Sequence, residues 1–225
     1  MKIGPVYKGK LVRRYKRFLA DITLDDGTQI TAHCPNSGSM KTLSDAGNVC
    51  YVTYDPAPNR KLDYTLQFID AEGLACVNTM LPNELVNEAL VDGKLPFEFI
   101  SISRERVFHD SRLDFFLDPW FVEVKNVTML HGTVASFPDA VTARGKKHLI
   151  SLQQAVKEGY KAGIFYVVNH TGALSFSIAD WIDPEYDKEF KKAIAAGVQV
   201  FVYKSEIKIG EYAEISISSP LPFPS

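Results

Sequence analysis

The chain has 225 residues, of which 46% are hydrophobic, and a formal net charge of -2. A chain of this length buries about 70–75% of its unfolded surface, and its nearly balanced charge excludes a polycation that coats nucleic acid, so any such contact needs a local patch. Three widely spaced cysteines without a C-x-x-C pair favour a reducing compartment over a disulfide framework or a zinc cluster. We find neither a secretory signal nor a bilayer-spanning stretch, and therefore expect a soluble, cytoplasmic protein with no membrane partner.

Residues 1–80 have the pattern of a small β-barrel. The segment "VRRYKRFLADITL" is expected to be a strand that runs into the turn "DDG" and pairs with "TQITAH". After the loop "CPNSGSM", further strands are predicted at "NVCYVTY", "DYTLQFI" and "LACVNT". Short strands separated by Gly, Pro and Asn clusters predict a barrel domain over residues 1–80, for which an OB-like barrel is one option.

Residues 81–225 have a different pattern, in which helices alternate with strands. A short helix is predicted at "ELVNEAL", capped by Asn83 and ended by Gly93. Strands are expected at residues 98–108, 112–117 and 120–128, and a helix within 140–158. Then come a strand, "GIFYVVN", a helix from Asp183 to Gly197, a strand, "VQVFVY", and an irregular tail, "SSPLPFPS". This order predicts an antiparallel meander followed by parallel strands, which is a mixed-sheet α/β domain over residues 81–225.

Two acids and a lysine lie in the predicted meander. Strand alternation puts Glu123 and Lys125 on one face. A loop with an even number of residues would set Asp114 opposite Glu123, whereas a three-residue loop would place it on the other face. We expect a four-residue loop over 117–120, because Pro119 cannot take the positive φ of a common two-residue turn.

Two carboxylates on one face are hard oxygen ligands that suit Mg²⁺ or Mn²⁺. Such an ion would activate a water and neutralise charge on a phosphate, and Lys125 could orient that water or stabilise the oxyanion. This pattern predicts metal ligands at Asp114 and Glu123. The alternative is a solvated strand face on which Glu123 and Lys125 pair weakly.

The two neighbouring helices add further candidates. Arg144 and His148 share a helical face with Leu152, so we expect them to look toward the sheet, with Arg144 suited to an anion. Alternatively, the histidine is a satisfied core residue. Lys147 lies on the other side of that helix, where it could be a solvated lysine. Glu88 on the earlier helix could supply a third carboxylate.

Basic residues are concentrated between Lys8 and Arg17, where no acid interrupts them and Tyr15 interleaves. On a barrel face, cations can bind phosphates and aromatic rings can stack on exposed bases. The alternative is an edge strand that its charges protect from aggregation. The loop "HCPNSGSM", which we place at the domain junction, could bind an anion through its amides or simply be a tight loop.

Six segments in order along nearly the whole chain, "RYKRFLAD", "HCPNSGSM", "CVNT", "SRLDF", "EVKNVT" and "FPDAVTARGKKHL", resemble the sugar fermentation stimulation protein family, SfsA. The resemblance implies an N-terminal OB-like barrel joined to a domain of PD-(D/E)XK nuclease-like fold. It also implies sequence-non-specific DNA binding and a regulatory role in sugar (maltose) metabolism. Asp114, Glu123 and Lys125 would match the nuclease motif, with Glu88 as an acid on the preceding helix. Leu113 stands where that motif often has proline.

Two functions remain open: a regulator that binds double- or single-stranded DNA without cutting it, and a metal-dependent DNA phosphodiesterase. A sugar-binding protein has little support, because no carbohydrate-binding constellation of aromatic residues is evident. For the phosphodiesterase the expected catalytic residues are Asp114, Glu123, Lys125 and Glu88, and for either function a homodimer is an open alternative. The expected DNA contacts are Arg13, Arg14, Lys16, Arg17, Arg112, Arg144, Lys147 and His148.

Overall fold

A computed structural model describes residues 1–223, which form fifteen strands and three helices. The strands of the first part are β1 (Lys2–Tyr15), β2 (Leu19–Leu24), β3 (Gln29–His33), β4 (Val49–Tyr54), β5 (Tyr64–Asp70) and β6 (Leu74–Cys76). Those of the second part are β7 (Ile102–Phe108), β8 (Ser111–Leu117), β9 (Trp120–Val127), β10 (Met129–His131), β11 (Val134–Phe137), β12 (Lys161–Val168), β13 (Ser175–Ile178), β14 (Gln199–Ile209) and β15 (Tyr212–Pro220). The helices are α1 (Leu81–Val91), α2 (Ala143–Lys157) and α3 (Pro184–Ala195).

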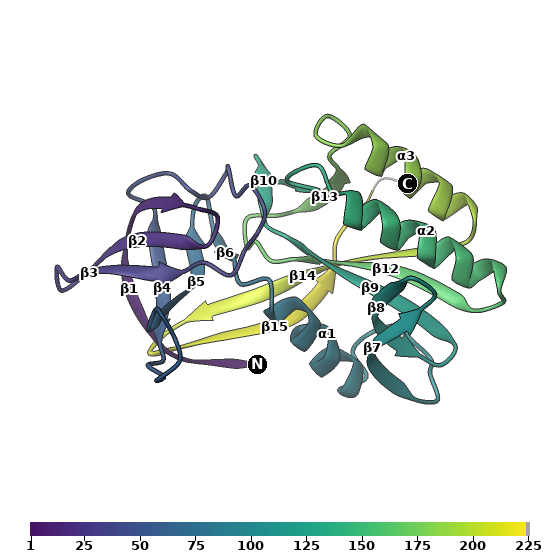
Figure 1. Cartoon of the computed structure of the whole chain (residues 1–225), viewed down its shortest axis with the longest axis horizontal. Coiled ribbons are helices and arrows are strands. Elements are labelled where there is room, and N and C mark those ends of the chain that lie inside the picture. Colours follow the sequence, from purple (N-terminus) through teal and green to yellow (C-terminus); the bar gives the residue numbers. More distant parts are fainter. Residues whose placement is uncertain (224–225) are drawn as a thin grey trace.

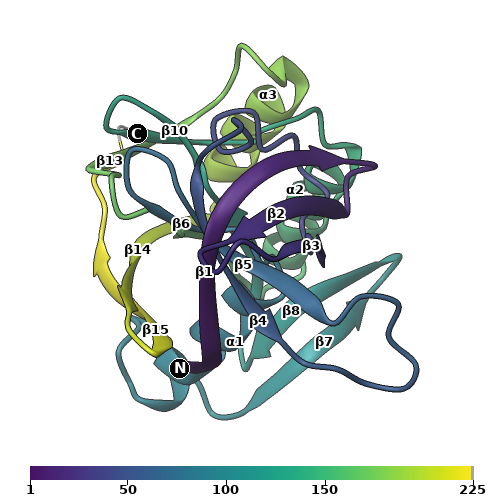
Figure 2. The ribbon, with the colours of Figure 1, turned by 90° about the vertical axis from the view of Figure 1, so that its left-hand side faces the viewer.

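The first part is a closed five-stranded barrel, as the sequence predicted (Figures 1 and 2). Strand β1 pairs with β2 on one side and β4 on the other, and β3 and β5 complete the ring. Inward side chains such as Leu11, Ile22 and Leu66 fill the barrel. The prediction of one continuous strand through "VRRYKRFLADITL" was wrong. Lys16 and Arg17 adopt positive φ, and the chain turns back there into β2.

The second part is a mixed sheet with helices on both faces. Strands β7, β8 and β9 form the predicted antiparallel meander, and β9, β12 and β14 are parallel. Side chains of β12 alternate between two cores. Phe165 and Val167 pack with α1, whereas Ile164 and Tyr166 pack with α2 and α3. Burial of both faces explains why "GIFYVVN" is a continuous apolar run rather than an alternating one.

Helix boundaries follow the capping signals in two of three cases. The Thr142 hydroxyl accepts a hydrogen bond from the Gly145 N–H at the start of α2, and Asp183 caps α3 as predicted. Asn83 does not cap α1, because this helix begins earlier and Asn83 lies inside its first turn. A small sheet of β10, β11 and β13 was not predicted.

A long hairpin of β14 and β15 joins the two parts into one sheet. Strand β15 pairs with β14 and with the beginning of β1, where Lys2 lies opposite Glu214. The strand order is β2-β3-β5-β4-β1-β15-β14-β12-β9-β8-β7. The segment predicted as an irregular tail contributes Ser218–Pro220 to β15, while Pro224 and Ser225 lie outside the described residues.

The cysteines lie in the barrel and at its junction with the second part. All three are free and buried, and burial raises the pKa of Cys50 and Cys76 to about 12. They are therefore part of the core packing. Within residues 1–223, no helix is long and apolar enough to cross a membrane.

Candidate metal and nucleic-acid site

The β8–β9 hairpin brings the two predicted carboxylates together. Its loop consists of Asp118 and Pro119, joined by a cis peptide bond, rather than the four residues predicted. A turn with cis-proline at its third position does not need the positive φ on which the prediction relied. Leu117 lies opposite Trp120, and Phe115 lies opposite Val122, which is the predicted register. Continued by one residue, this register places Asp114 opposite Glu123.

The ladder between β8 and β9 ends at Phe115 and Val122. Beyond it, the Asp114 side chain rather than its backbone bonds to β9. Its Oδ2 accepts a hydrogen bond of 2.8 Å from the Val124 N–H, and its Oδ1 accepts one of 2.8 Å from Asn83 Nδ2. Burial, together with the nearby charge of Glu123, raises the pKa of Asp114 to about 6. Near neutral pH the carboxylate is therefore largely ionised, but it sits where negative charge is costly.

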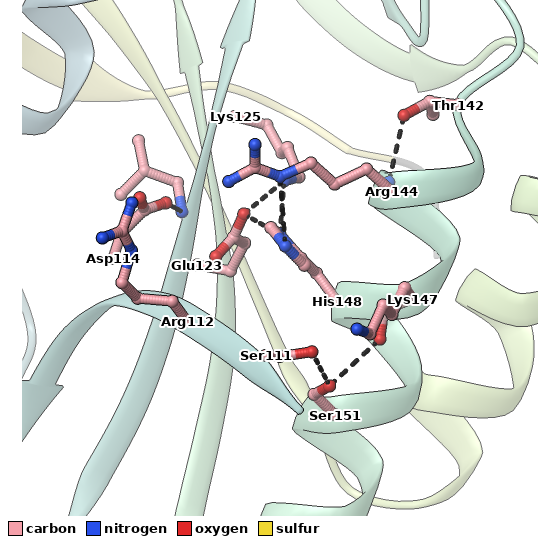
Figure 3. Close-up of polar contacts among 12 residues, drawn as sticks. Ser111, Arg112, Asp114, Glu123, Lys125, Thr142, Arg144, Lys147, His148 and Ser151 are labelled. Carbon is pink, nitrogen blue, oxygen red and sulfur yellow. Dashed lines mark hydrogen bonds and ion pairs between the residues drawn. The ribbon is translucent and has the colours of Figure 1, made fainter. Parts of the chain in front are cut away.

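Glu123 is the most deeply buried acid of the site, with an exposure of 2%. Its Oε1 accepts a hydrogen bond of 2.5 Å from Lys125 Nζ and a second one from His148 Nδ1 (Figure 3). Burial alone would raise the pKa of Glu123, but the charge of Lys125 and the bond from His148 outweigh it and lower this pKa. The other oxygen, Oε2, is buried and has no hydrogen-bond partner.

Helix α2 supplies two basic side chains to this face of the sheet, as predicted. His148 is buried behind Glu123, and Arg144 lies one turn earlier, with its Nε 3.4 Å from His148 Nε2. The ring connects the carboxylate to both cations, because Nδ1 faces Glu123 Oε1 and Lys125 Nζ while Nε2 faces Arg144 Nε. Figure 3 shows Arg144 extending from α2 across the ring toward Lys125 and Glu123.

The acids line a cavity of about 410 Å³ between the barrel and the mixed sheet. Lys125, Arg144 and Asn83 also line it, and the barrel contributes the loop 36–38. This is part of the loop that the sequence places at the domain junction. The remaining lining comes mostly from two segments of the second part, 124–129 and 136–142.

The barrel loop is held firmly on both sides. Arg14 donates hydrogen bonds to the carbonyl oxygens of Asn36, Gly38 and Ser39, at 2.8–3.1 Å. Across the junction, Ser39 Oγ donates to the carbonyl oxygen of Asp139 at 2.7 Å, and the Met40 N–H donates to the carboxylate of Asp139 at 3.2 Å. The loop is thus a fixed wall of the cavity.

One edge of β9 is open toward the cavity. Strand β12 pairs with β9 as far as Val127, but β8 pairs with β9 only as far as Val122. In an antiparallel ladder the N–H and C=O of one residue point to the same side, and the sides alternate along the strand. Because the Val124 N–H points to Asp114, the Val124 carbonyl and both backbone groups of Asn126 also face that side.

Glu88 does not reach this site, which corrects the expectation of a third carboxylate. Its Oε2 pairs instead with the N-terminal ammonium group at 2.8 Å. Asn83 does reach the site, and five residues at about 100° each turn Glu88 some 140° away from it around the helix. Asn83 is a site residue that our sequence analysis missed, because we took it for a helix cap.

The basic residues at the barrel fall into two groups. Arg14 is committed to the loop carbonyls, and Arg13 pairs with Asp21 at 2.8 Å. Lys16 and Arg17 are exposed at the β1–β2 turn, and neither forms an ion pair within residues 1–223. A contact between Arg14 and DNA is therefore excluded as long as the loop keeps its place, whereas Lys16 and Arg17 remain available.

The other predicted contacts are likewise divided. Arg112 pairs with Glu105 at 2.7 Å, and Lys147 pairs with Asp110 at 3.1 Å; both basic side chains are exposed and lie outside the cavity lining. His148 is only 5% exposed, so it can act on a ligand only through Glu123 or Arg144. Their roles toward DNA stay predictions.

At this hairpin a divalent cation would have two carboxylates, those of Asp114 and Glu123, as its protein ligands. In residues 1–223, no group of three or more His, Cys, Asp and Glu side chains is arranged to hold a metal. A cation here would therefore complete its coordination with water, as Mg²⁺ usually does. The unpartnered Oε2 of Glu123 is the observation that favours such a ligand, because a buried carboxylate oxygen normally has a partner.

The barrel continues into a mixed sheet, and a hairpin beside their junction carries two carboxylates and a lysine. These features define a two-domain protein of the OB and nuclease-like class. Residues 12–77 match the family described as "SfsA N-terminal OB domain", and residues 80–211 match the "Sugar fermentation stimulation protein RE domain". The chain belongs to the sugar fermentation stimulation protein family, SfsA, as the resemblance implied.

Relatives and a solved structure agree over nearly the whole chain. Sugar fermentation stimulation protein homologs of Geobacter sulfurreducens and Geobacter metallireducens are 42% and 44% identical, covering 97% of this chain and 96% and 97% of theirs. The structure of Pyrococcus furiosus SfsA in complex with Ca²⁺ is similar with a TM-score of 0.84 at 23% identity, over 98% of this chain and 96% of that one. The predicted fold class, an OB-like barrel followed by a mixed-sheet nuclease-like domain, is confirmed.

Proposed function

We propose that this protein binds DNA without sequence specificity at the junction of its two domains, and that Asp114 and Glu123 hold Mg²⁺ or Mn²⁺ there. The observation that carries the proposal is the buried, unpartnered Oε2 of Glu123, in a residue that lines the same cavity as Asp114. The cavity lies between an OB barrel and a nuclease-like sheet.

When bound, the cation would offset the negative charge of the acids and of a phosphate oxygen. Neighbouring groups of the protein set the charge and the orientation of the two carboxylates before a cation binds. Lys125 and His148 keep Glu123 ionised, and the Val124 N–H and Asn83 fix the orientation of the Asp114 carboxylate. The ammonium and guanidinium groups of Lys125 and Arg144 are positioned to attract a phosphate.

The cation part of the proposal also has support from a related protein. The Pyrococcus furiosus structure is described as a complex with Ca²⁺. Calcium and magnesium both prefer oxygen ligands, although Ca²⁺ accepts more of them at longer distances. We infer that this chain also binds a hard divalent cation.

The DNA part of the proposal rests on the available positive charges. Lys16 and Arg17 at the barrel turn and Arg144 at the cavity form no ion pair within residues 1–223, so each can contact a phosphate. Contacts to phosphates carry no sequence information and weaken with salt. Such binding would suit a cytoplasmic regulator. The maltose-related role that the family resemblance implies would then depend on this DNA binding.

Phosphodiester hydrolysis is the second candidate, favoured by the position of Lys125 Nζ 2.5 Å from Glu123 Oε1. Hydrolysis adds water across a P–O bond and leaves a phosphate monoester and a hydroxyl group. An ammonium group at this point can stabilise the charge that develops on the phosphate oxygens.

The experiment compares the wild type with Glu123→Gln and, as a matched control, Glu206→Gln, since Glu206 lies in a surface pair with Lys208 outside the cavity. Plasmid, linear duplex and single-stranded DNA are incubated with Mg²⁺, Mn²⁺ or chelator, and binding and cutting are both measured. We expect all three proteins to bind DNA, with the cation strengthening binding only where Glu123 is intact. Cutting that needs the cation and Glu123 establishes the second candidate, and no DNA binding under any condition refutes the proposal. Circular dichroism checks that each variant is folded.

A further inference from the structure

The cavity lining combines charged and neutral side chains. Asp114, Glu123, Lys125 and Arg144 line it beside the hairpin, Asp139 lines it beside the barrel loop, and Asn126 adds a neutral amide from β9. A strand rises about 3.3 Å per residue, so Asn126 lies about 10 Å further along β9 than Glu123. A ligand that extends along β9 would therefore meet the charged side chain of Glu123 first and the neutral amide of Asn126 further on.

Asn126 is held in one orientation by a fully buried partner. Its Oδ1 accepts a hydrogen bond of 2.7 Å from Asn169 Nδ2, and Asn169 is 0% exposed. The backbone of Asn169 is itself fixed, because its N–H donates to Val127 and its carbonyl oxygen accepts from Cys76. The Nδ2 group of Asn126 makes no hydrogen bond within residues 1–223, so it remains a donor, beside the open backbone edge of β9.

The opposite wall is rigid and limits the size of the ligand. Asn36 Nδ2 donates to the Val77 carbonyl oxygen at 3.1 Å, and Asn36 Oδ1 accepts from the Gly38 N–H at 2.8 Å. Gly38 lies so close to Asp139 that a Cβ there would be 2.4 Å from its carboxylate. A cavity of about 410 Å³ between fixed walls cannot admit B-DNA, whose major groove alone is about 12 Å wide.

We propose that the cavity takes one unpaired nucleotide, with its phosphate at Lys125 and Arg144 and its base at Asn126, so that single-stranded DNA or a single-stranded overhang is the preferred ligand. This inference rests on the proposed DNA binding and names its substrate class. An amide donor can bond the acceptor atoms that all four bases carry. Recognition through Asn126 Nδ2 is therefore compatible with binding that ignores sequence. Splayed, unpaired bases are also the form of nucleic acid that side-chain pockets can hold.

The test measures fluorescence anisotropy with three labelled DNAs of one sequence: a single strand, a blunt duplex, and a duplex with a single-stranded overhang. Each is titrated with wild type, Asn126→Ala, Asn126→Asp and the control Asn87→Ala, in Ca²⁺ and in chelator. Asn126→Asp keeps the acceptor for Asn169, but it removes the donor and adds a negative charge. Asn87 lies on α1 outside the cavity lining.

We expect the single strand and the overhang to bind the wild type at least about tenfold more tightly than the blunt duplex. Asn126→Ala should lose about three- to tenfold in affinity for the single strand, the range of one hydrogen bond. Asn126→Asp, whose carboxylate also repels the strand, should lose at least as much. Both variants should bind the blunt duplex within twofold of the wild type, as should Asn87→Ala for all three DNAs. Equal affinity of the wild type for single strand and duplex, or folded Asn126 variants with unchanged affinity, overturns the inference alone. If no DNA binds at all, the proposed function fails with it.

Discussion

Replacing Asp114 by asparagine tests whether this carboxylate is held in an environment that disfavours its charge. Burial and Glu123 raise the pKa of Asp114 from 3.8 to about 6. The folded protein therefore binds this proton more tightly than the unfolded chain. The resulting stabilisation is fully present below about pH 4 and is lost as the pH rises through about 6. A rise of this size corresponds to about 3 kcal/mol of unfolding free energy.

Asparagine cannot ionise, so the variant escapes this loss. It has one carbonyl oxygen for the two donors that the carboxylate served, the Val124 N–H and Asn83 Nδ2. The unmatched donor costs about 1–3 kcal/mol, and this cost does not depend on pH. The informative quantity is therefore how the difference between variant and wild type changes with pH.

Urea unfolding of both proteins, in chelator and at half-unit steps from pH 4 to pH 8, gives this difference directly. We expect it to move by about 2.4 kcal/mol in favour of Asp114→Asn between pH 4 and pH 7.5, with most of the change below pH 6.5. A difference that stays flat, or that moves in favour of the wild type as pH rises, would refute the account of this carboxylate. Adding Mg²⁺ at pH 7.5 should stabilise the wild type and have little effect on the variant.

Three other changes probe the ion pair, the barrel loop and the barrel turn. Lys125→Met removes the ammonium group from the buried pair and should lower the unfolding free energy by about 3–5 kcal/mol at pH 7.5, measured in urea; a loss below 1 kcal/mol would mean that the pair is effectively solvated. Gly38→Ala pushes against Asp139 and should weaken single-strand binding severalfold, whereas Gly4→Ala, with no atom within 4 Å of its new Cβ, should not; equal affinities would show that the loop can yield freely. Lys16→Ser with Arg17→Ser should reduce the slope of log K against log salt by about 1.4 for a single strand, and an unchanged slope would remove these residues from the interface.

The sequence predicted the elements whose signals are local. Helix α3 has an N-cap, a proline in its first turn and a glycine beyond its end, and the structure places Asp183 and Gly197 accordingly. The buried strand β12 and the meander were also predicted, because apolar runs and alternation report burial directly. The pairing of β15 with β1 was not, since it joins residues more than two hundred positions apart.

For the site, the sequence predicted the carboxylate register but not the contacts that depend on the rotation of α1. Alternation and an even loop put Asp114 opposite Glu123, although the loop is shorter than we expected. The start of α1 was misplaced, so Asn83 was taken for a cap. Glu88 was considered because the family resemblance places an acid on this helix, but it lies about 140° around the helix from Asn83, which reaches the site.

Charge runs were the weakest guide to function. The basic run at the barrel contains Arg14, which holds a loop, and Arg13, which pairs with Asp21. A sequence shows that cations are close in the chain but not which of them find acceptors after folding. Only the structure separates such committed residues from Lys16 and Arg17, which stay available to a phosphate.

Anomalous diffraction from crystals grown with Mn²⁺ shows whether Asp114 and Glu123 together hold a divalent cation. We expect one strong anomalous peak within coordination distance of carboxylate oxygens of both residues, and its loss in crystals of Glu123→Gln. A peak held by other residues, or none at this hairpin in crystals that bind Mn²⁺ elsewhere, would contradict the claim that these two carboxylates form a divalent-cation site.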